Sequence, residues 1–136
     1  MQIYFAASIA GGRNYLATYQ QMVAFMQQLG HQVLTEHIIA PDVLDQESHL
    51  TPEQIYRRDV DWLARSEAVV AEISNPSLGV GYEICFALGL HKRVLCLHRR
   101  GLFISRMIIG NDRPGLTIAD YASDEEWQGD IERFLS

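Results

Sequence analysis

Hydrophobic residues along this chain alternate between short apolar runs, typical of buried strands, and segments in which they recur every three or four positions. The run at residues 2–7 predicts a first strand. A helical spacing follows it at Leu16, Tyr19, Val23, Met26 and Leu29. Gly30 is placed to end this helix, and residues 31–34 predict a second short strand.

The next segment, residues 35–50, shows no clear period, so we expect a long functional loop or a partly irregular stretch there. A helix is predicted to run to about residue 66, because Thr51 is a good N-cap, Pro52 suits the first helical position and Gln54 can complete a capping box. Further strands are expected at residues 68–73 and 93–97, a strand or irregular edge at 116–121, and helices at 81–90, 102–109 and 123–135.

Strands and helices therefore alternate throughout the chain. This order predicts a compact α/β sandwich with a parallel sheet, helices on both faces, and loops gathered at the carboxyl ends of the strands. The 136 residues fit one domain, residues 1–136, which is long enough to bury a core without disulfides.

Composition and charge narrow the classes of function. A formal net charge of -6 with scattered Lys and Arg argues against a nucleic acid polymer as partner. No stretch approaches the roughly 20 apolar residues that span a membrane, and no signal-peptide pattern is present, so we expect a soluble cytoplasmic protein that binds no membrane. Cys85 and Cys96 lie in apolar segments, which predicts buried thiols in a reducing compartment, and no metal site is supported.

Glu83 is the only charged residue between Glu72 and His91, inside a glycine-spaced apolar run. A carboxylate in such surroundings is costly unless it is used or paired. Residues 75–81 predict a strand-to-helix turn with Glu83 in the first turns of the helix, at the sheet edge where open parallel sheets bind ligands. Taken alone, Glu83 is more simply interpreted as an acid that complements the helix dipole.

A second carboxylate, Asp59, falls on the apolar stripe of its predicted helix, between Ile55 and Trp62. It is either a functional group or the partner of a nearby cation, although Arg57 and Arg58 are expected on other faces. Two carboxyl groups at one pocket can divide labour, because one can stay ionised while the other carries a proton. This arrangement is used to break a bond at an anomeric carbon.

Two predicted turns can hold an anion at the same edge. Residues 8–13 join the first strand to the first helix, where free N–H groups and glycines let a phosphate approach, although Gly-Gly there is usually just a turn. Ser77 can supply further donors. His37 follows the second strand toward this edge, with a satisfied or solvent-facing histidine as the simpler interpretation, and Tyr4 in mid-strand is most simply a core residue.

Together these residues resemble the 2'-deoxynucleoside 5'-phosphate N-hydrolases within the nucleoside 2-deoxyribosyltransferase superfamily. The resemblance covers essentially the whole chain, and its most specific block is Ser-Leu-Gly-Val-Gly-Tyr-Glu at residues 77–83. It also rests on residues 3–13, 33–37, 59, 62–63, 69–72, 76, 92–97 and 105–108. The resemblance implies a flavodoxin-like three-layer sandwich with a five-stranded parallel sheet, a homodimer, and cleavage of the N-glycosidic bond of a nucleoside 5'-monophosphate without metal or organic cofactor.

The resemblance also implies roles for single residues. Glu83 is implied as the nucleophile that forms a glycosyl-enzyme intermediate, Asp59 as the acid/base for the departing base, and Tyr4 as the group that orients Glu83. The groups implied around the 5'-phosphate are Ser8, Gly11, Gly12, Ser77 and, from the second subunit of the dimer, Ser105. Gly79 is implied as a further substrate-binding residue. Ile9 and His37 are implied to line the base pocket.

One position departs from the family pattern. The mammalian-type hydrolases carry an arginine before the Gly-Gly pair, whereas this chain has Ala10. Either Arg13 takes over the phosphate contact, or phosphate dependence weakens and a nucleoside or a differently substituted nucleotide becomes the substrate. A charge-assisted contact contributes roughly 1.5 to 3 kcal/mol, so its loss costs on the order of tenfold to a hundredfold in discrimination.

Two other hypotheses stay open at this point. The first is a transferase that passes the deoxyribosyl group to a second base, since it shares the same covalent intermediate. The second is a nucleotide-binding module without turnover, because a fold alone does not establish catalysis.

Overall fold

The apolar runs form the strands of a single parallel sheet. The computed structural model describes residues 1–9 and 13–136, so the predictions for Ala10, Gly11 and Gly12 lie outside the described residues. Within the described residues the strands are β1 (Gln2–Ala6), β2 (Gln32–Val33), β3 (Ala68–Glu72), β4 (Arg93–Arg99) and β5 (Leu116–Tyr121). Their order is β2-β1-β3-β4-β5, which is the flavodoxin-like order, and ligands in such sheets bind at the carboxyl ends of β1 and β3, where the winding reverses.

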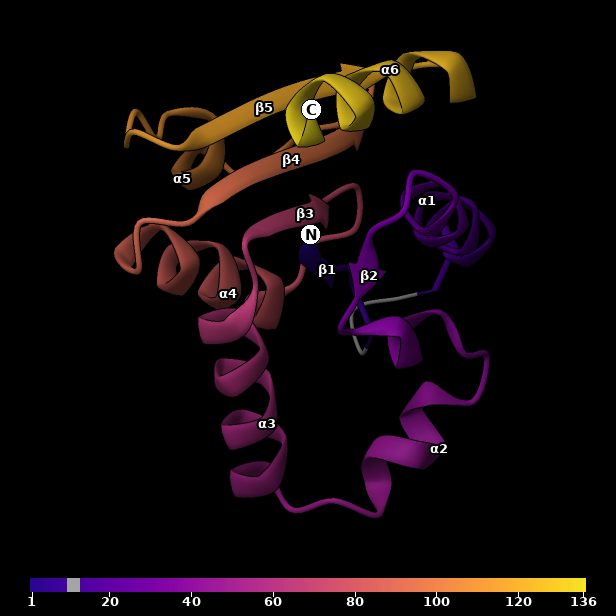
Figure 1. Cartoon of the computed structure of the whole chain (residues 1–136), viewed down its shortest axis with the longest axis vertical. Helices are drawn as coiled ribbons and strands as arrows, with labels where there is room; N and C mark the ends of the chain where they lie inside the picture. The colour runs from indigo at the N-terminus through magenta and orange to yellow at the C-terminus, as the bar shows by residue number, and fades with distance from the viewer. Residues whose placement is uncertain (10–12) are drawn as a thin grey trace.

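Helices connect successive strands and cover both faces of the sheet. They are α1 (Leu16–Gln28), the 3₁₀ helix η1 (Glu36–Ile39), α2 (Val43–Ser48), α3 (Pro52–Arg65), α4 (Leu78–Gly89), α5 (Arg106–Ile109) and α6 (Asp124–Leu135). Figure 1 shows α1 and α6 on one side of the sheet and α3 and α4 on the other. Among the described residues, no helix is long and apolar enough to cross a membrane.

Side-chain alternation along β1 divides the core between these two faces. Ile3 and Phe5 pack with Tyr19 of α1 and Trp127 of α6. Tyr4 and Ala6 point to the opposite face and pack with Leu63 of α3 and Ile84 of α4. Because successive residues of a strand face opposite sides, Tyr4 is directed toward the helices that carry Asp59 and Glu83.

The helix α4 begins three residues earlier than predicted. The Ser77 hydroxyl accepts a hydrogen bond from the Val80 N–H at 3.3 Å, so Ser77 is the N-cap and Leu78 the first helical residue. Glu83 is therefore the sixth residue of α4, and the first turn of this helix contains no acidic residue. The interpretation of Glu83 as a first-turn acid is wrong, so the free-energy cost of burying its carboxylate is not offset by the helix N-terminus.

The segment at residues 35–50 is more regular than expected, since it contains both η1 and α2. The second strand is shorter than predicted because the side chain of Thr35 takes over the pairing with β1. Its hydroxyl accepts from the Phe5 N–H at 2.9 Å and donates to the Phe5 carbonyl at 2.6 Å. This places η1, and with it His37, beside the carboxyl end of β1.

Other predictions hold with adjustments. Thr51 and Gln54 form the reciprocal capping box of α3, with Pro52 at its first position. The helix predicted at residues 102–109 is confined to the four residues of α5. The prediction of two buried thiols is wrong in one case: Cys96 is buried in β4, whereas Cys85 is exposed, because it lies on the outer side of α4.

Candidate active site

Tyr4 and Glu83 meet between β1 and α4. The Tyr4 hydroxyl is hydrogen-bonded to the Glu83 carboxylate, whose other oxygen, Oε2, is buried and has no partner among the described residues. Burial is the largest influence on Glu83 and raises its pKa to about 7, while the Tyr4 hydrogen bond opposes the rise. A buried carboxylate with one unpartnered oxygen is a strong candidate for direct contact with a substrate.

Asp59 faces the same space from α3. Its carboxylate is half-buried, and burial raises its pKa, whereas a hydrogen bond from Arg58 lowers it. The Arg58 Nε lies 2.9 Å from Asp59 Oδ1, so Arg58 is its partner although the sequence placed it on another face. The negative charge of Asp59 also raises the pKa of Glu83, which shows that the two carboxylates act on one another.

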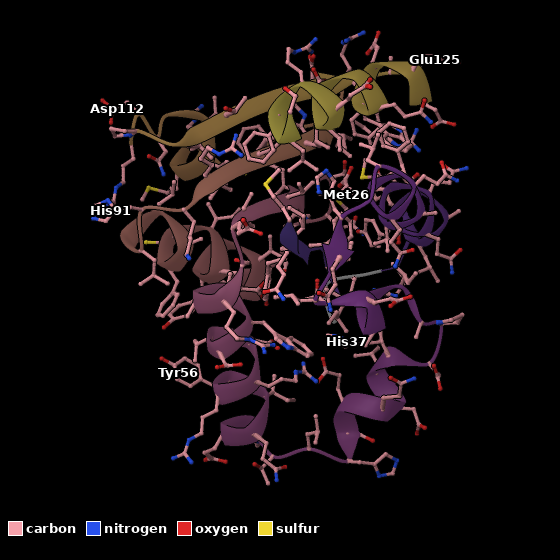
Figure 2. The ribbon with its side chains drawn as sticks, viewed as in Figure 1. Met26, His37, Tyr56, His91, Asp112 and Glu125 are labelled. Atoms are coloured by element: carbon pink, nitrogen blue, oxygen red, sulfur yellow. The ribbon has the colours of Figure 1, made fainter. Side chains whose placement is uncertain are left out.

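A further acid that the sequence did not indicate belongs to this cluster. Glu47 on α2 accepts from Arg58 Nη2 at 3.1 and 3.2 Å and lies 3.6 Å from His37 Nε2. The centroid of the His37 ring, which is labelled in Figure 2, lies 5.3 Å from that of the Trp62 ring, and this contact joins η1 to α3. Hydrophobic periodicity does not single out Glu47, because the six residues of α2 complete too few turns to show a period.

The turn after β1 brings Ser8 and Arg13 to the same edge. Ser8 is buried, and in the described part of the chain its hydroxyl has no hydrogen-bond partner. The Arg13 guanidinium donates to the carbonyls of Ser8 at 3.1 Å, Ile38 at 2.6 Å and Ala40 at 3.3 Å. Arg13 therefore ties this turn to the segment that carries His37.

The turn after β3 lies next to it, because Ala6 of β1 pairs with Ala71 of β3 and the two strands end at the same level. Ser77 caps α4 there, where its hydroxyl oxygen accepts from the Val80 N–H. A Cβ added to Gly79 would lie 3.8 Å from Glu83 Oε1 and 3.9 Å from Ser77 Oγ. Gly79 thus leaves open the space that links the carboxylate to the cap of the helix.

Two predicted site residues lie apart from the Tyr4–Asp59–Glu83 cluster. Ile9 is half-buried and packs against the core on the α1 side of the sheet. Ser105 is exposed, and its hydroxyl accepts from the Met107 N–H at the start of α5. The described residues contain no group of three or more His, Cys, Asp or Glu arranged to hold a metal ion.

A buried polar network that the sequence did not predict supports the turn after β3. Glu72 is fully buried, and its carboxylate accepts hydrogen bonds from the N–H and hydroxyl of Ser74 and from the hydroxyl of Tyr121. The Ser74 hydroxyl also accepts from the Arg99 N–H at 2.9 Å. These bonds fasten the start of the turn to β4 and β5, so the turn enters α4 in a defined direction.

The fold and the site together define a class: a flavodoxin-like α/β protein with two interacting carboxylates at the carboxyl edge of its sheet. The sequence model of the family described as Nucleoside 2-deoxyribosyltransferase matches residues 3–122, and the chain belongs to this family.

Several known proteins are similar to the chain. The 5-hydroxymethyl-dUMP N-hydrolase of Tetraodon nigroviridis is 45% identical over 130 residues, covering 92% of this chain and 91% of the relative. A Methanococcoides burtonii protein, provisionally named 2'-deoxynucleoside 5'-phosphate N-hydrolase 1, is 41% identical over 118 residues, covering 87% of this chain and 97% of the relative. The structure of the Clostridium botulinum CMP N-glycosidase shares the fold, with a TM-score of 0.75 at 16% identity and coverage of 98% and 99%.

Proposed function

We propose that this protein is an N-glycosidase that hydrolyses a nucleoside or 2'-deoxynucleoside 5'-monophosphate to the free base and the sugar 5-phosphate. The observation that carries the proposal is the Glu83 carboxylate, which is hydrogen-bonded to Tyr4, interacts electrostatically with Asp59 and has a buried Oε2 without a hydrogen-bond partner among the described residues. The relatives named as hydrolases of nucleotide N-glycosidic bonds support the substrate class.

The reaction runs in two displacement steps. Glu83 attacks C1' of the sugar, the bond from C1' to the base nitrogen breaks, and the proton of Asp59 passes to the departing base. Water then attacks C1' of the glycosyl ester, its proton passes to Asp59, and the Glu83 carboxylate is released. Tyr4 donates to the carboxylate and so directs its free oxygen toward the sugar.

The phosphate is proposed to lie where the turns after β1 and β3 meet. In the described structure Ser8 lies in the turn after β1, Ser77 ends the turn after β3 as the N-cap of α4, and Gly79 is the second residue of α4. Gly11 and Gly12 are retained in the proposal from the sequence. Because the guanidinium of Arg13 already donates to three carbonyls, we assign Arg13 to holding the turn rather than to replacing the missing cation at Ala10.

A nucleotide panel tests the proposed reaction. Deoxynucleoside 5'-monophosphates are expected to release free base, and the matching unphosphorylated nucleosides are expected to react at least about tenfold less efficiently, because they lose hydrogen bonds from the turns. Chromatography of released base measures both. Absence of base from every nucleotide contradicts the proposal, and exchange onto an added second base would identify a transferase instead.

The proposed assembly is a homodimer that forms through an apolar patch. The patch, called the α4–α5 patch, also includes Tyr56 of α3, whose ring contacts that of Tyr82 on α4. Its exposed side chains are those of Tyr56, Leu78, Tyr82, Phe103, Met107 and Ile109. Tyr56 projects from α3 away from α2 (Figure 2). Ser105 lies between Phe103 and Met107 of this patch in the sequence, and we propose that a second copy seated there brings its own Ser105 to the site. We also propose a cytoplasmic location, where free thiols such as Cys85 and Cys96 stay reduced.

Met107→Asp tests the dimer. The Met107 side chain is 82% exposed, so the change is expected to leave the monomer folded while placing a charge in the proposed interface. Light scattering should show a dimer for the unmodified protein and a monomer for the variant, with a KM raised at least several-fold. Leu44→Asp, at an exposed leucine of α2 outside the patch, is the matched control and should remain dimeric; a dimeric Met107→Asp variant contradicts the assignment of the patch.

A further inference from the structure

One guanidinium connects two acids from different helices. Arg58 Nε contacts Asp59 Oδ1 at 2.9 Å, and Arg58 Nη2 contacts both oxygens of Glu47 at 3.1 and 3.2 Å. The two carboxylates occupy different positions of the same planar fork, so Arg58 cannot strengthen its contact with one of them without reorienting on the other. The α2 and α3 helices face each other in Figure 1, and this bridge joins them.

The ionic bridge formed by Glu47, Arg58 and Asp59 is partly buried, which strengthens the interactions between its charges. The side chain of Glu47 is only 13% exposed, and those of Arg58 and Asp59 are about one quarter exposed, so these charges are screened less than a surface pair. Arg58 is also stacked over the Trp62 ring at 5.0 Å, which limits the directions it can take. An ion pair held in this way has a defined geometry rather than many alternatives.

The remaining titratable groups around Asp59 come from three other elements. His37 of η1 lies 3.6 Å from Glu47, farther than Arg58 does, and its Nδ1 is buried with no partner in the described residues. Glu83 of α4 and Tyr4 of β1 interact electrostatically with Asp59. Among the described residues that act on Asp59, Arg58 is the one hydrogen-bonded to it, and Glu47 competes for Arg58.

We propose that Glu47 and Arg58 are positioning residues, and that Glu47 controls how tightly Asp59 holds its proton by drawing part of the Arg58 charge away from it. The inference rests on the proposed function, in which Asp59 gives its proton to the departing base. Arg58 alone favours the carboxylate form of Asp59, which cannot donate a proton. Glu47 reduces this influence and adds its own negative charge, so Asp59 retains a proton at higher pH.

The signs of the expected changes follow from the charges. Removing the negative charge of Glu47 lowers the pKa of Asp59 and of Glu83, because Glu47 raises both. Removing the positive charge of Arg58 raises both pKa values, because Arg58 lowers both. A purely structural role for this pair would change the reaction rate without moving the pH dependence in opposite directions.

The experiment compares Glu47→Gln, Arg58→Gln and a matched control, Glu53→Gln. Glu53 is an exposed acid in the first turn of α3, so the control makes the same substitution and the same change of net charge outside the cluster. The pH dependence of kcat/KM is measured for base release from a nucleoside 5'-monophosphate. Carbon-detected NMR follows the titration of the Asp59 and Glu83 carboxyl groups without substrate.

Glu47→Gln is expected to move the pH profile and both titrations to lower pH by about half a unit, Arg58→Gln to higher pH, and the control to leave them unchanged. Shifts in the same direction for both variants, or a Glu47→Gln shift no larger than that of Glu53→Gln, would overturn the inference. If Arg58→Gln does not fold, the comparison of Glu47→Gln with Glu53→Gln decides. Titrations that move as expected in a protein that releases no base would support the bridge and reject the proposed function.

Discussion

Replacing Glu83 with Gln is expected to lower the rate of base release by at least about a thousandfold, because an amide cannot form the glycosyl ester that the reaction requires. Glutamine keeps the size of the side chain and can still accept the hydrogen bond from Tyr4. The loss therefore reports the chemistry of the carboxylate rather than a change in packing. Initial rates on a saturating nucleotide measure it, with Glu125→Gln on the exposed surface of α6 (Figure 2) as the control.

Asp59→Asn separates the two carboxylates. The drop in the rate of base release caused by Asp59→Asn should be smaller for substrates whose base leaves readily, since such a base needs less help from an acid. The drop caused by Glu83→Gln should not depend on the leaving base. A Glu83→Gln enzyme that keeps more than a tenth of the activity would contradict the assignment of the nucleophile. Equal dependence on the leaving base in both variants would contradict the division of roles.

The substitution Glu83→Gln is also expected to stabilise the fold at high pH. Glu83 has an ordinary pKa of 4.5 that folding raises to about 7, so the folded protein binds more protons than the unfolded chain between these values. Stability is then lost as pH rises through this window, by about 3 kcal/mol in all, since one pH unit corresponds to about 1.4 kcal/mol. Glutamine has no charge and avoids this loss.

Thermal unfolding of Glu83→Gln and the unmodified protein at pH 4 and pH 8 measures the effect. The two melting temperatures should be similar at pH 4, and the variant should melt about 5–10 °C higher at pH 8. Glu125→Gln should show no such dependence on pH. An equal difference at both pH values would mean that the carboxylate of Glu83 is not destabilised by burial. A variant that loses activity and gains stability is expected when the substituted group is catalytic and its burial in charged form destabilises the fold.

The fold could be predicted from the sequence because alternating strands and helices leave few topologies for a chain of this length. The start of α4 could not, since Pro76, Gly79 and Gly81 favour a turn by local preference. In the structure, the Ser77 cap and the burial of Val80 outweigh that preference. Tertiary packing here decides a boundary that local composition obscures.

The candidate site was partly predictable for a similar reason. Tyr4, Asp59 and Glu83 stand out as polar groups at positions that periodicity assigns to the interior, and one face of the sheet brings them together. Glu47 has no such pattern, and it joins the cluster through Arg58, whose long side chain reaches back to its neighbour Asp59. Helical position alone does not predict a contact of that kind.

The contrast between the two thiols gives the molecule a built-in reporter. Cys85 is accessible on the outer side of α4, so a thiol reagent can attach a fluorophore to this helix without denaturing the protein. Cys96 is fully buried in β4, and burial raises its pKa, so it is unreactive until the strand opens. Once Cys85 is blocked, the rate at which Cys96 becomes labelled measures how often the centre of the sheet exposes itself to solvent.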